Sequence, residues 1–319
     1  MRAVQITSLD GPDAVEVGEL PEPTAGEGQL LVRVRAAGVS FPEVLQTRGQ
    51  YQMKPDLPFV PGSEVAGEVV TAPEGSSFAP GDRVAGFCLL GGFAELAVAP
   101  VDMTFPLPDA LSYEEGAAVL LNYLTVHFGL LERGGLRTGE RVLVHGAAGG
   151  VGTAAIQVAK AYGAGHVIAV VSTAEKGAVA IEAGADEFVL ADGFLDAVKA
   201  SGQVDVVVDP VGGDRFTDSL RSLREGGRLL VVGFTGGSIP EVKVNRLLLN
   251  NTTVVGVGWG ASVLARPGYV ASQWQDLLPH LESGALKPPI GATFGIDDVA
   301  EALRTIDERR ATGKVLLTP

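Results

Sequence analysis

The residues best suited to chemistry form a glycine-rich loop between an apolar run at 141–146 and a helical pattern at 151–163. The loop reads Ala147-x-Gly149-x-x-Gly152. A small first residue allows the tight turn, Gly149 lets backbone approach a pyrophosphate, and Gly152 lets the helix pack closely on the strand. The helix start adds free N–H groups and about half a positive charge. The spacing predicts a dinucleotide-phosphate site, and the alternative is a glycine turn without a ligand.

The end of the second predicted strand bears on which dinucleotide binds. NAD-binding domains usually place Asp or Glu about 20 residues past the loop, where it holds the ribose 2′-hydroxyl. Residues 171–173 read Val-Ser-Thr, without a carboxylate. Ser172 leaves room for a 2′-phosphate and Lys176 can supply positive charge, although Glu175 is close and Lys176 could simply be solvated. The pattern predicts NADPH rather than NADH.

Metal and nucleophile chemistry find little support in the sequence. Zinc needs Cys, His or carboxylate ligands that converge on one point. One cysteine, Cys88, and four histidines show neither a CxxC nor an HxxxH spacing. His127 and His145 are more typical of core or turn positions, and Cys88 of a buried filler rather than a reactive thiol. No Gly-x-Ser-x-Gly elbow occurs, and we expect no metal.

Composition limits the class of protein. The 319 residues suit two domains, and 46% hydrophobic with 19% charged residues indicates a well-buried globular chain. A net charge of -14 argues against nucleic-acid binding. A single cysteine excludes an intrachain disulfide and favours a reducing compartment. With no signal segment and no run of about 18 apolar residues, we expect a cytoplasmic protein without a membrane span.

Residues 1 to about 110 have the texture of a β domain. The start of the chain reads as a strand, and short strand patterns occur at 30–36, 65–70, 83–86 and 95–98. The patterns predict a mostly antiparallel, barrel-like domain. A capping box at Ser112 and Glu115 then predicts a helix that runs to about Glu132.

From Arg141 onward, strand and helix patterns alternate. Several strand cores are apolar on both faces, which is typical of a buried parallel sheet. The pattern predicts a doubly wound domain with six parallel strands. The expected strands are 141–146, 167–171, 187–190, 204–208, 228–233 and 253–257, and the expected helices are 151–163, 174–184, 193–201, 214–224 and 243–250.

The alternation stops near residue 260. A helix at 270–283, a short strand, a helix with buried-face residues at Val299 and Leu303, and a last strand at 314–317 follow. We expect this tail to return to the first domain. The predicted division is therefore 122–260 for the dinucleotide-binding domain, and 1–121 with 261–319 for a catalytic domain.

Taken together, six segments resemble the medium-chain dehydrogenase/reductase superfamily and, within it, the zinc-free quinone oxidoreductase (ζ-crystallin-like) branch. They are 36–41, 61–67, 80–84, 122–125, 145–152 and 312–315, so the resemblance covers nearly the whole chain. It implies an α/β fold with a Rossmann domain and a GroES-like domain, NADPH as cofactor, and a homodimer. Edge pairing of the strand at 253–256 is one way to form that dimer.

The chain departs from its relatives in the substrate region. Zinc members of the superfamily place Cys near Ser40 and His near Ser63, so both ligands are absent here. Quinone reductases commonly have Asn and Asp where this chain has Ser40 and Glu43. One tyrosine of that segment becomes Leu45, while a later one is kept as Tyr51.

The resemblance also implies how the reaction proceeds. The protein holds the nicotinamide against an electron-poor acceptor and excludes water, in a cleft between the domains near the carboxyl ends of the strands. Thr125 and Lys314 are positioned by resemblance near the nicotinamide. The predicted cofactor-binding residues are Thr125, Ala148, Gly149, Gly150, Val151, Ser172, Lys176, Val211, Phe234, Thr235, Gly258, Trp259 and Lys314.

Two residues are candidates for catalysis. Tyr51 could act as a proton donor, worth about 10²–10⁴ in rate, because related enoyl reductases use a tyrosine in this segment; the alternative is that it only packs over the substrate. Ser40 could hydrogen-bond substrate or nicotinamide, or merely replace a lost ligand. The predicted function is NADPH-dependent reduction of a quinone or α,β-unsaturated carbonyl. Two alternatives remain. The protein could be an enoyl-thioester reductase, or a nucleotide-binding structural or sensor protein without turnover.

Overall fold

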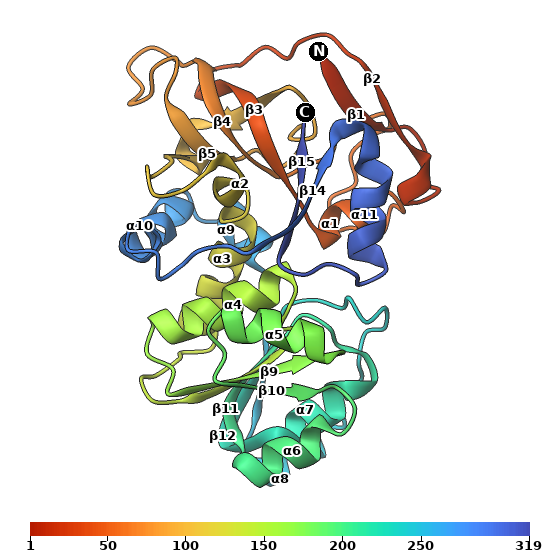
Figure 1. Ribbon diagram of the computed structural model, residues 1–319, viewed down its shortest axis with the longest axis vertical. Helices are drawn as coiled ribbons and strands as arrows, with labels where there is room; N and C mark the ends of the chain where they lie inside the picture. The colour runs from red at the N-terminus through yellow and green to blue at the C-terminus, as the bar shows by residue number, and fades with distance from the viewer. The chain divides into compact units, whose positions relative to one another are not determined.

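The computed structural model describes residues 1–319 and divides them into two compact units. Unit 1 comprises Met1–Leu121, Gly268–Gly284 and Pro288–Pro319, and unit 2 comprises Asn122–Pro267 and Ala285–Lys287. The chain enters unit 2 within helix α3 (Leu120–His127) and later returns to unit 1. Figure 1 follows this path by colour from the N-terminus to the C-terminus.

Unit 2 contains the predicted doubly wound domain. Its six strands are all parallel and lie in the order β10-β9-β8-β11-β12-β13. Their bounds are β8 (Arg141–His145), β9 (His166–Val171), β10 (Glu187–Leu190), β11 (Val204–Asp209), β12 (Leu223–Val231) and β13 (Thr253–Gly256). The order reverses between β8 and β11, and such a switch point is where open α/β sheets bind ligands.

Helices connect these strands at nearly the positions that the sequence predicts. They are α4 (Gly150–Ala161), α5 (Ala174–Glu182), α6 (Phe194–Ser201), α7 (Phe216–Ser222) and α8 (Asn245–Asn250). A short helix α9 (Trp259–Leu264), which follows β13, was not predicted. The expected helix at 214–224 is too long and the strand at 228–233 begins too late. β12 already pairs with β11 at Leu223, and a register shift follows around Gly226, whose φ is 75°.

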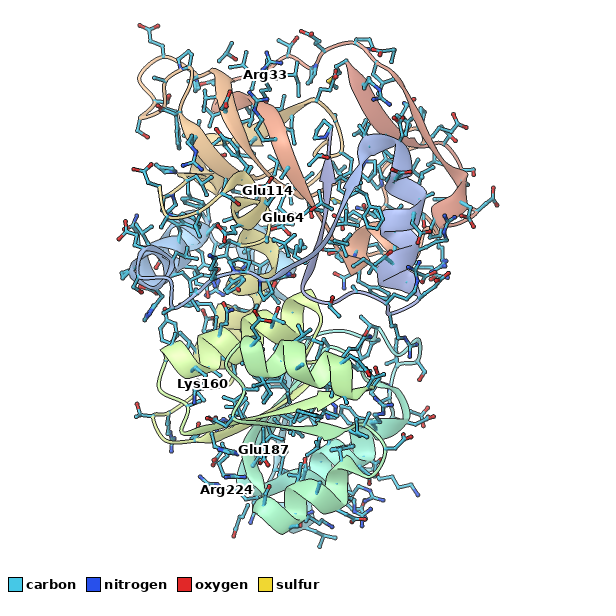
Figure 2. The ribbon with its side chains drawn as sticks, in the orientation of Figure 1. Arg33, Glu64, Glu114, Lys160, Glu187 and Arg224 are labelled. Carbon is cyan, nitrogen blue, oxygen red and sulfur yellow. The ribbon has the colours of Figure 1, made fainter.

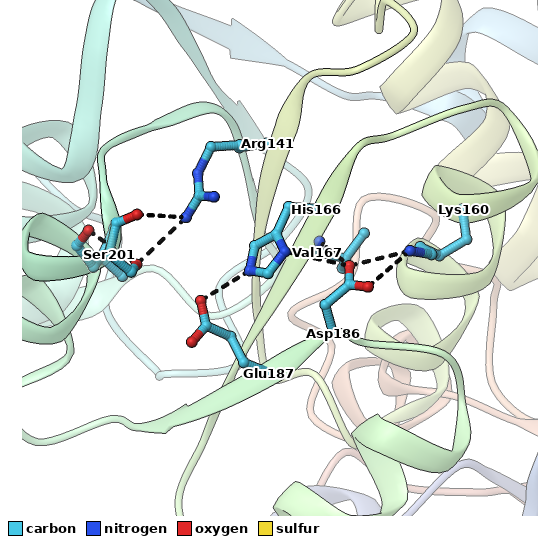
Figure 3. Close-up of polar contacts among 8 residues, drawn as sticks. Arg141, Lys160, His166, Val167, Asp186, Glu187 and Ser201 are labelled. Carbon is cyan, nitrogen blue, oxygen red and sulfur yellow. Dashed lines mark hydrogen bonds and ion pairs between the residues drawn. The ribbon is translucent and has the colours of Figure 1, made fainter.

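The amino ends of the strands are occupied by interactions within the protein (Figure 3). Asp186 accepts hydrogen bonds from Lys160 Nζ at 2.9 Å and from Val167 N at 2.7 Å. Nearby, His166 Nε2 lies 2.9 Å from a carboxylate oxygen of Glu187. Side chains at this edge therefore bond to one another, whereas the glycine loop lies at the opposite edge, where the strands end.

Unit 1 is built on a mostly antiparallel sheet, as predicted. Its path is β14-β15-β3-β4-β5-β7, β6 also pairs with β3, and β1 and β2 form a separate ribbon. The bounds are β1 (Arg2–Ile6), β2 (Val15–Glu19), β3 (Gln29–Val39), β4 (Glu64–Thr71), β5 (Arg83–Phe87), β6 (Leu96–Pro100), β7 (Thr104–Pro106), β14 (Ile290–Gly295) and β15 (Lys314–Thr318). Strands β14 and β7 end the path without pairing to each other, so the sheet is not a closed barrel.

The helices of unit 1 are α1 (Phe41–Gln46), α2 (Tyr113–Gly116), α10 (Tyr269–Glu282) and α11 (Val299–Asp307). The Ser112 capping box is formed, with Glu115 N donating to Ser112 Oγ at 3.2 Å. The expected single helix over 112–132 is wrong. It is divided into α2, α3 and a wider π-type segment at Phe128–Arg133, where Gly134 N donates to Gly129 O at 2.7 Å.

No helix of the structure combines the length and apolar character that a bilayer crossing requires.

Candidate active site

The loop between β8 and α4 has the shape that its glycines predict. A Cβ on Gly152 would lie 2.2 Å from Gly146 O and 2.6 Å from Ala147 Cα, so only glycine allows this close packing. A Cβ on Gly149 would meet only Gly146 O, at 3.4 Å, which leaves the approach to the loop open. The first N–H groups of α4 have no partner within the helix. The geometry of the loop is therefore compatible with a pyrophosphate at the predicted residues Ala148, Gly149, Gly150 and Val151.

Two further loops meet at the same edge of the sheet. Asp209, at the end of β11, accepts hydrogen bonds from Val211 N and Gly212 N at 2.9 Å each. Thr235, after β12, donates through Oγ1 and through its backbone N to Pro210 O, both at 3.1 Å. These bonds fix Val211 and Thr235 beside the switch point. Both were predicted to face the cofactor.

The end of β9 carries no carboxylate, as the sequence predicts. Ser172 is exposed, and Thr173 caps α5 by accepting a hydrogen bond from Lys176 N at 3.3 Å. The Lys176 side chain is half-buried, and this burial lowers the pKa of its ammonium. A hydroxyl and an amine within one turn fit a 2′-phosphate.

The remaining predicted residues of unit 2 take different positions. Thr125 and Phe234 are half-buried, Gly258 is exposed, and Trp259 begins α9 with its side chain buried in the protein. Trp259 therefore offers backbone rather than ring to a ligand.

His145 directly precedes the glycine loop and is held by a buried hydrogen bond. It ends β8, is 1% exposed, and its Nε2 lies 2.8 Å from Ser219 Oγ. Ser219 donates its hydroxyl proton to Arg215 O at 3.0 Å, so its oxygen can accept from a protonated Nε2. Burial lowers the pKa of His145, against an opposing effect of Asp209. The imidazole is thus a neutral structural donor, as its predicted core position suggests.

Unit 1 holds a buried polar cluster that we name the Ser40 cluster; its members are Ser40, Glu43, Ser63, Glu64 and Lys314. Lys314, at the start of β15, is 3% exposed and forms an ion pair with Glu64, which is 0% exposed. Its Nζ also donates to Ser40 Oγ at 2.6 Å. The second oxygen of Glu64 accepts from Leu121 N at 2.8 Å. Figure 2 labels Glu64, which begins β4.

The room for Glu64 comes from a missing side chain. A Cβ on Gly38 would lie 2.6 Å from Glu64 Oε1 and 2.5 Å from Ala117 O. Glycine at position 38 of β3 therefore lets the carboxylate reach Lys314.

The other half of the cluster surrounds Glu43. Ser63 Oγ donates to one oxygen of Glu43 at 2.8 Å, and Ser40 N donates to the other at 3.0 Å. Burial raises the pKa of Glu43, partly offset by the Ser63 hydrogen bond and the charge of Lys314. The positions where zinc members have Cys and His thus hold two serines joined to carboxylates. No group of three or more His, Cys, Asp or Glu side chains in the structure is arranged to bind a metal.

Tyr51 and Cys88 lie close to this cluster. Burial, and then the charge of Glu43, raise the pKa of Tyr51, so its phenol keeps its proton at neutral pH. Cys88 is buried, and its thiol donates to Gly62 O at 3.5 Å.

The structure brings Ser40 and Lys314 together, a contact that the sequence did not predict. Lys314 near the nicotinamide stays a prediction; in the structure its ammonium contacts Ser40 and Glu64. Glu64 was missed altogether. The available signal was a carboxylate at the head of the apolar strand pattern at 65–70.

A parallel sheet with a glycine loop at its switch point, joined to a separate mostly-β unit, defines a dinucleotide-dependent oxidoreductase of the medium-chain type. Family models agree: the "alcohol dehydrogenase GroES-like domain" matches residues 26–109 and the "zinc-binding dehydrogenase" model matches 150–283. The chain belongs to this superfamily and, within it, to the quinone oxidoreductase branch.

Relatives place the chain in that branch. A quinone oxidoreductase-like protein 2 homolog from Nematostella vectensis is 36% identical over 99% of this chain and 88% of its own length. Human quinone oxidoreductase is 33% identical over 99% of this chain and 97% of its own. Among solved structures, the quinone oxidoreductase of Thermus thermophilus, studied alone and with NADPH, has 36% identity and a TM-score of 0.87, with 100% of both chains covered. The Escherichia coli enzyme in complex with NADPH has 28% identity and a TM-score of 0.90, also over 100% of both.

Proposed function

We propose that the chain is an NADPH-dependent oxidoreductase that reduces quinones or α,β-unsaturated carbonyl compounds without zinc. The observation that carries this proposal is the β8–α4 loop, open at Gly149 and closed by Gly152, with Ser172 and Lys176 one strand away. NADPH-bound structures of similar proteins support the same cofactor. Once bound, NADPH supplies the hydride.

The residues of the protein bind and orient the cofactor and the acceptor. The α4 N–H groups bind the pyrophosphate, Ser172 and Lys176 hold the 2′-phosphate, and the Val211 and Thr235 loops orient the nicotinamide half together with Thr125, Phe234, Gly258 and Trp259. We assign to Tyr51, whose phenol is protonated at neutral pH, the donation of a proton to the acceptor or packing over it.

An acceptor panel tests the function. Purified protein should oxidise NADPH with a 1,2-quinone or a 1,4-quinone. Turnover with a crotonyl thioester instead would establish the second candidate, an enoyl-thioester reductase, which the protonated phenol of Tyr51 favours. Tight NADPH binding without turnover would indicate a nucleotide-binding sensor. Stoichiometric zinc in the purified protein would overturn the zinc-free part.

The assembly and compartment are part of the proposal. The exposed edge strand β13 and the apolar α8 beside it favour a homodimer. The single buried thiol of Cys88 fits a reducing compartment, for which we propose the cytoplasm.

A further inference from the structure

The hydroxyl of Ser40 is held in an unusual way for a residue that begins a helix. At α2, the equivalent Ser112 uses its oxygen to cap the helix. At α1, Ser40 and Glu43 form a capping box in which Ser40 N donates to Glu43 at 3.0 Å, and the Ser40 hydroxyl oxygen also accepts from Lys314 Nζ at 2.6 Å. Its own proton has no acceptor in the protein, and the residue keeps 8% of its surface exposed. The hydroxyl proton of Ser40 is therefore available to an acceptor from outside the protein.

The charge behind Ser40 is fixed in place. Lys314 pairs with Glu64, and Glu64 is in turn held by Leu121 N at 2.8 Å. An ammonium that donates to a hydroxyl oxygen polarises the O–H bond and strengthens it as a donor, because buried hydrogen bonds in a chain reinforce one another.

The Ser40 cluster contains two carboxyl groups, those of Glu43 and Glu64, and one ammonium group, that of Lys314. Glu43, on α1, faces Ser40 and Ser63, and Tyr51 and Cys88 are the other titratable groups near it. Lys314 contributes the one positive charge of the Ser40 cluster. Lys314 donates to the hydroxyl of Ser40, which is 8% exposed, whereas Glu64, its other partner, is 0% exposed.

We propose that Ser40 is a catalytic residue that donates a hydrogen bond and then a proton to the carbonyl oxygen of the acceptor, and that Lys314 is a positioning residue that orients and recharges it. The inference rests on the proposed function and names its substrate class, an acceptor whose reducible bond is conjugated to a carbonyl. It gives Lys314 a role on the acceptor rather than on the cofactor.

The proton and electron balance is simple. As hydride from NADPH adds to a carbon of the acceptor, the conjugated π system gives up a pair of electrons to the carbonyl oxygen. The O–H bond of Ser40 breaks and a new O–H bond forms on the acceptor, while a proton of Lys314 moves to Ser40 Oγ. After the product leaves, Ser40 passes its proton back to Lys314, a water molecule gives a proton to Ser40, and the resulting hydroxide leaves to the solvent.

The first test removes the donor and leaves the ion pair intact. Ser40→Ala should lower kcat with a quinone or enone acceptor by about 10²-fold, the usual loss for one oxyanion donor. The NADPH dissociation constant, measured by fluorescence, should stay within about twofold of wild type. Ser222→Ala is the matched control, since Ser222 is a fully buried serine whose hydroxyl bonds only to Ser219 O; its kcat should not change.

The second test removes the charge without leaving a buried carboxylate alone. Glu64→Gln combined with Lys314→Met keeps an acceptor for Leu121 N and should lower kcat by about 10-fold or more. Adding Ser40→Ala to this pair should give a total loss no greater than that of Ser40→Ala alone, about 10²-fold, because the residues act as a unit. A merely structural Lys314 would give independent, multiplicative losses.

The outcomes separate the two proposals. If wild type oxidises NADPH with the acceptors but Ser40→Ala keeps kcat within about threefold, the inference is wrong and the proposed function stands. If wild type oxidises NADPH with no acceptor, the proposed function fails and the inference falls with it. If the Glu64→Gln/Lys314→Met protein does not fold, Ser40→Ala alone tests the inference. Its second readout is the solvent deuterium isotope effect on kcat. If this isotope effect is present in wild type and absent in Ser40→Ala, the proton transfer from Ser40 is supported.

Discussion

At the scale of single residues, the Ser40 cluster shows how carboxylates can be accommodated where related proteins hold a metal. Each carboxylate oxygen has a donor: Ser63 and the Ser40 backbone for Glu43, and Lys314 and the Leu121 backbone for Glu64. Removing one partner of such a buried ion pair lowers the stability of the protein by about 3–5 kcal/mol, because the remaining charge is left without a partner in the interior. Both carboxylates of the Ser40 cluster therefore have all their oxygens bonded within the protein.

Cofactor preference is also decided by single side chains. Ser172→Asp places a carboxylate where NAD-binding domains hold the ribose 2′-hydroxyl. It should weaken NADPH binding by about 10-fold or more, through repulsion of the 2′-phosphate, and strengthen NADH binding. Fluorescence titration with both nucleotides measures the change. An unchanged ratio of the two dissociation constants would show that the 2′-phosphate binds elsewhere.

Cys88 should be chemically inert in the folded protein. Burial raises the pKa of its thiol to about 12, so almost no thiolate forms at pH 8. Iodoacetamide at that pH should leave native protein unmodified by mass spectrometry and label it fully in denaturant. Rapid labelling of the native protein would contradict the buried position.

At the scale of elements, the β8–α4 turn depends on one close approach. Gly152→Ala puts a methyl group 2.2 Å from Gly146 O, which the backbone can relieve only by moving the loop. NADPH affinity should fall by about 10-fold or more, with a lower Tm. Gly18→Ala is the control, because its Cβ would meet nothing within 4 Å. Normal NADPH binding by Gly152→Ala would refute the role assigned to this turn.

Arg48, just after α1, forms an ion pair with Asp307, the last residue of α11, and this pair has a defined pH dependence. Arg48 hydrogen-bonds Asp307 and thereby lowers its pKa from 3.8. A carboxylate with a lowered pKa in the folded state adds stability above its unfolded pKa and loses it as pH falls through the folded value. Arg48→Met should therefore cost about 1 kcal/mol at pH 7, and this difference should shrink as the pH falls below 3.8.

Urea unfolding at several pH values measures this difference. Arg221→Met removes an exposed pair with Asp218 and should have little effect at any pH. If the loss of unfolding free energy caused by Arg48→Met is the same in acid as at pH 7, packing of the Arg48 side chain rather than its charge stabilises this contact.

At the scale of the whole molecule, the free edge of the unit 2 sheet should pair with a second copy. Strand β13 ends the sheet, and in α8 Leu248 and Leu249 are 76% and 75% exposed. Light scattering should give twice the chain mass of 32.9 kDa. Leu248→Asp with Leu249→Asp should produce monomers, whereas Leu190→Asp on the opposite edge strand β10 should not. A wild-type monomer at micromolar concentration would refute the dimer.

Much of the fold follows from local pattern. The apolar strand cores and the spacing of the β8–α4 loop predicted all six parallel strands and their helices, because a buried parallel strand and a helix start each leave a signature within a few residues. Boundaries were less well predicted where long-range contacts decide them. Strand β12 starts early because Leu223 pairs with Val204, and the helix expected over 112–132 is interrupted.

The sequence by itself determined the class of cofactor site, since the loop, its flanking elements and Ser172 all lie within about 35 residues of chain and act through local backbone geometry. Only the tertiary structure decided what surrounds Ser40. Lys314 lies 274 positions away from it in sequence, and Glu64 reaches Lys314 only because Gly38 carries no side chain. Contacts between such distant residues depend on the pairing of strand β3 with β4 and β15, which brings together segments far apart in the sequence.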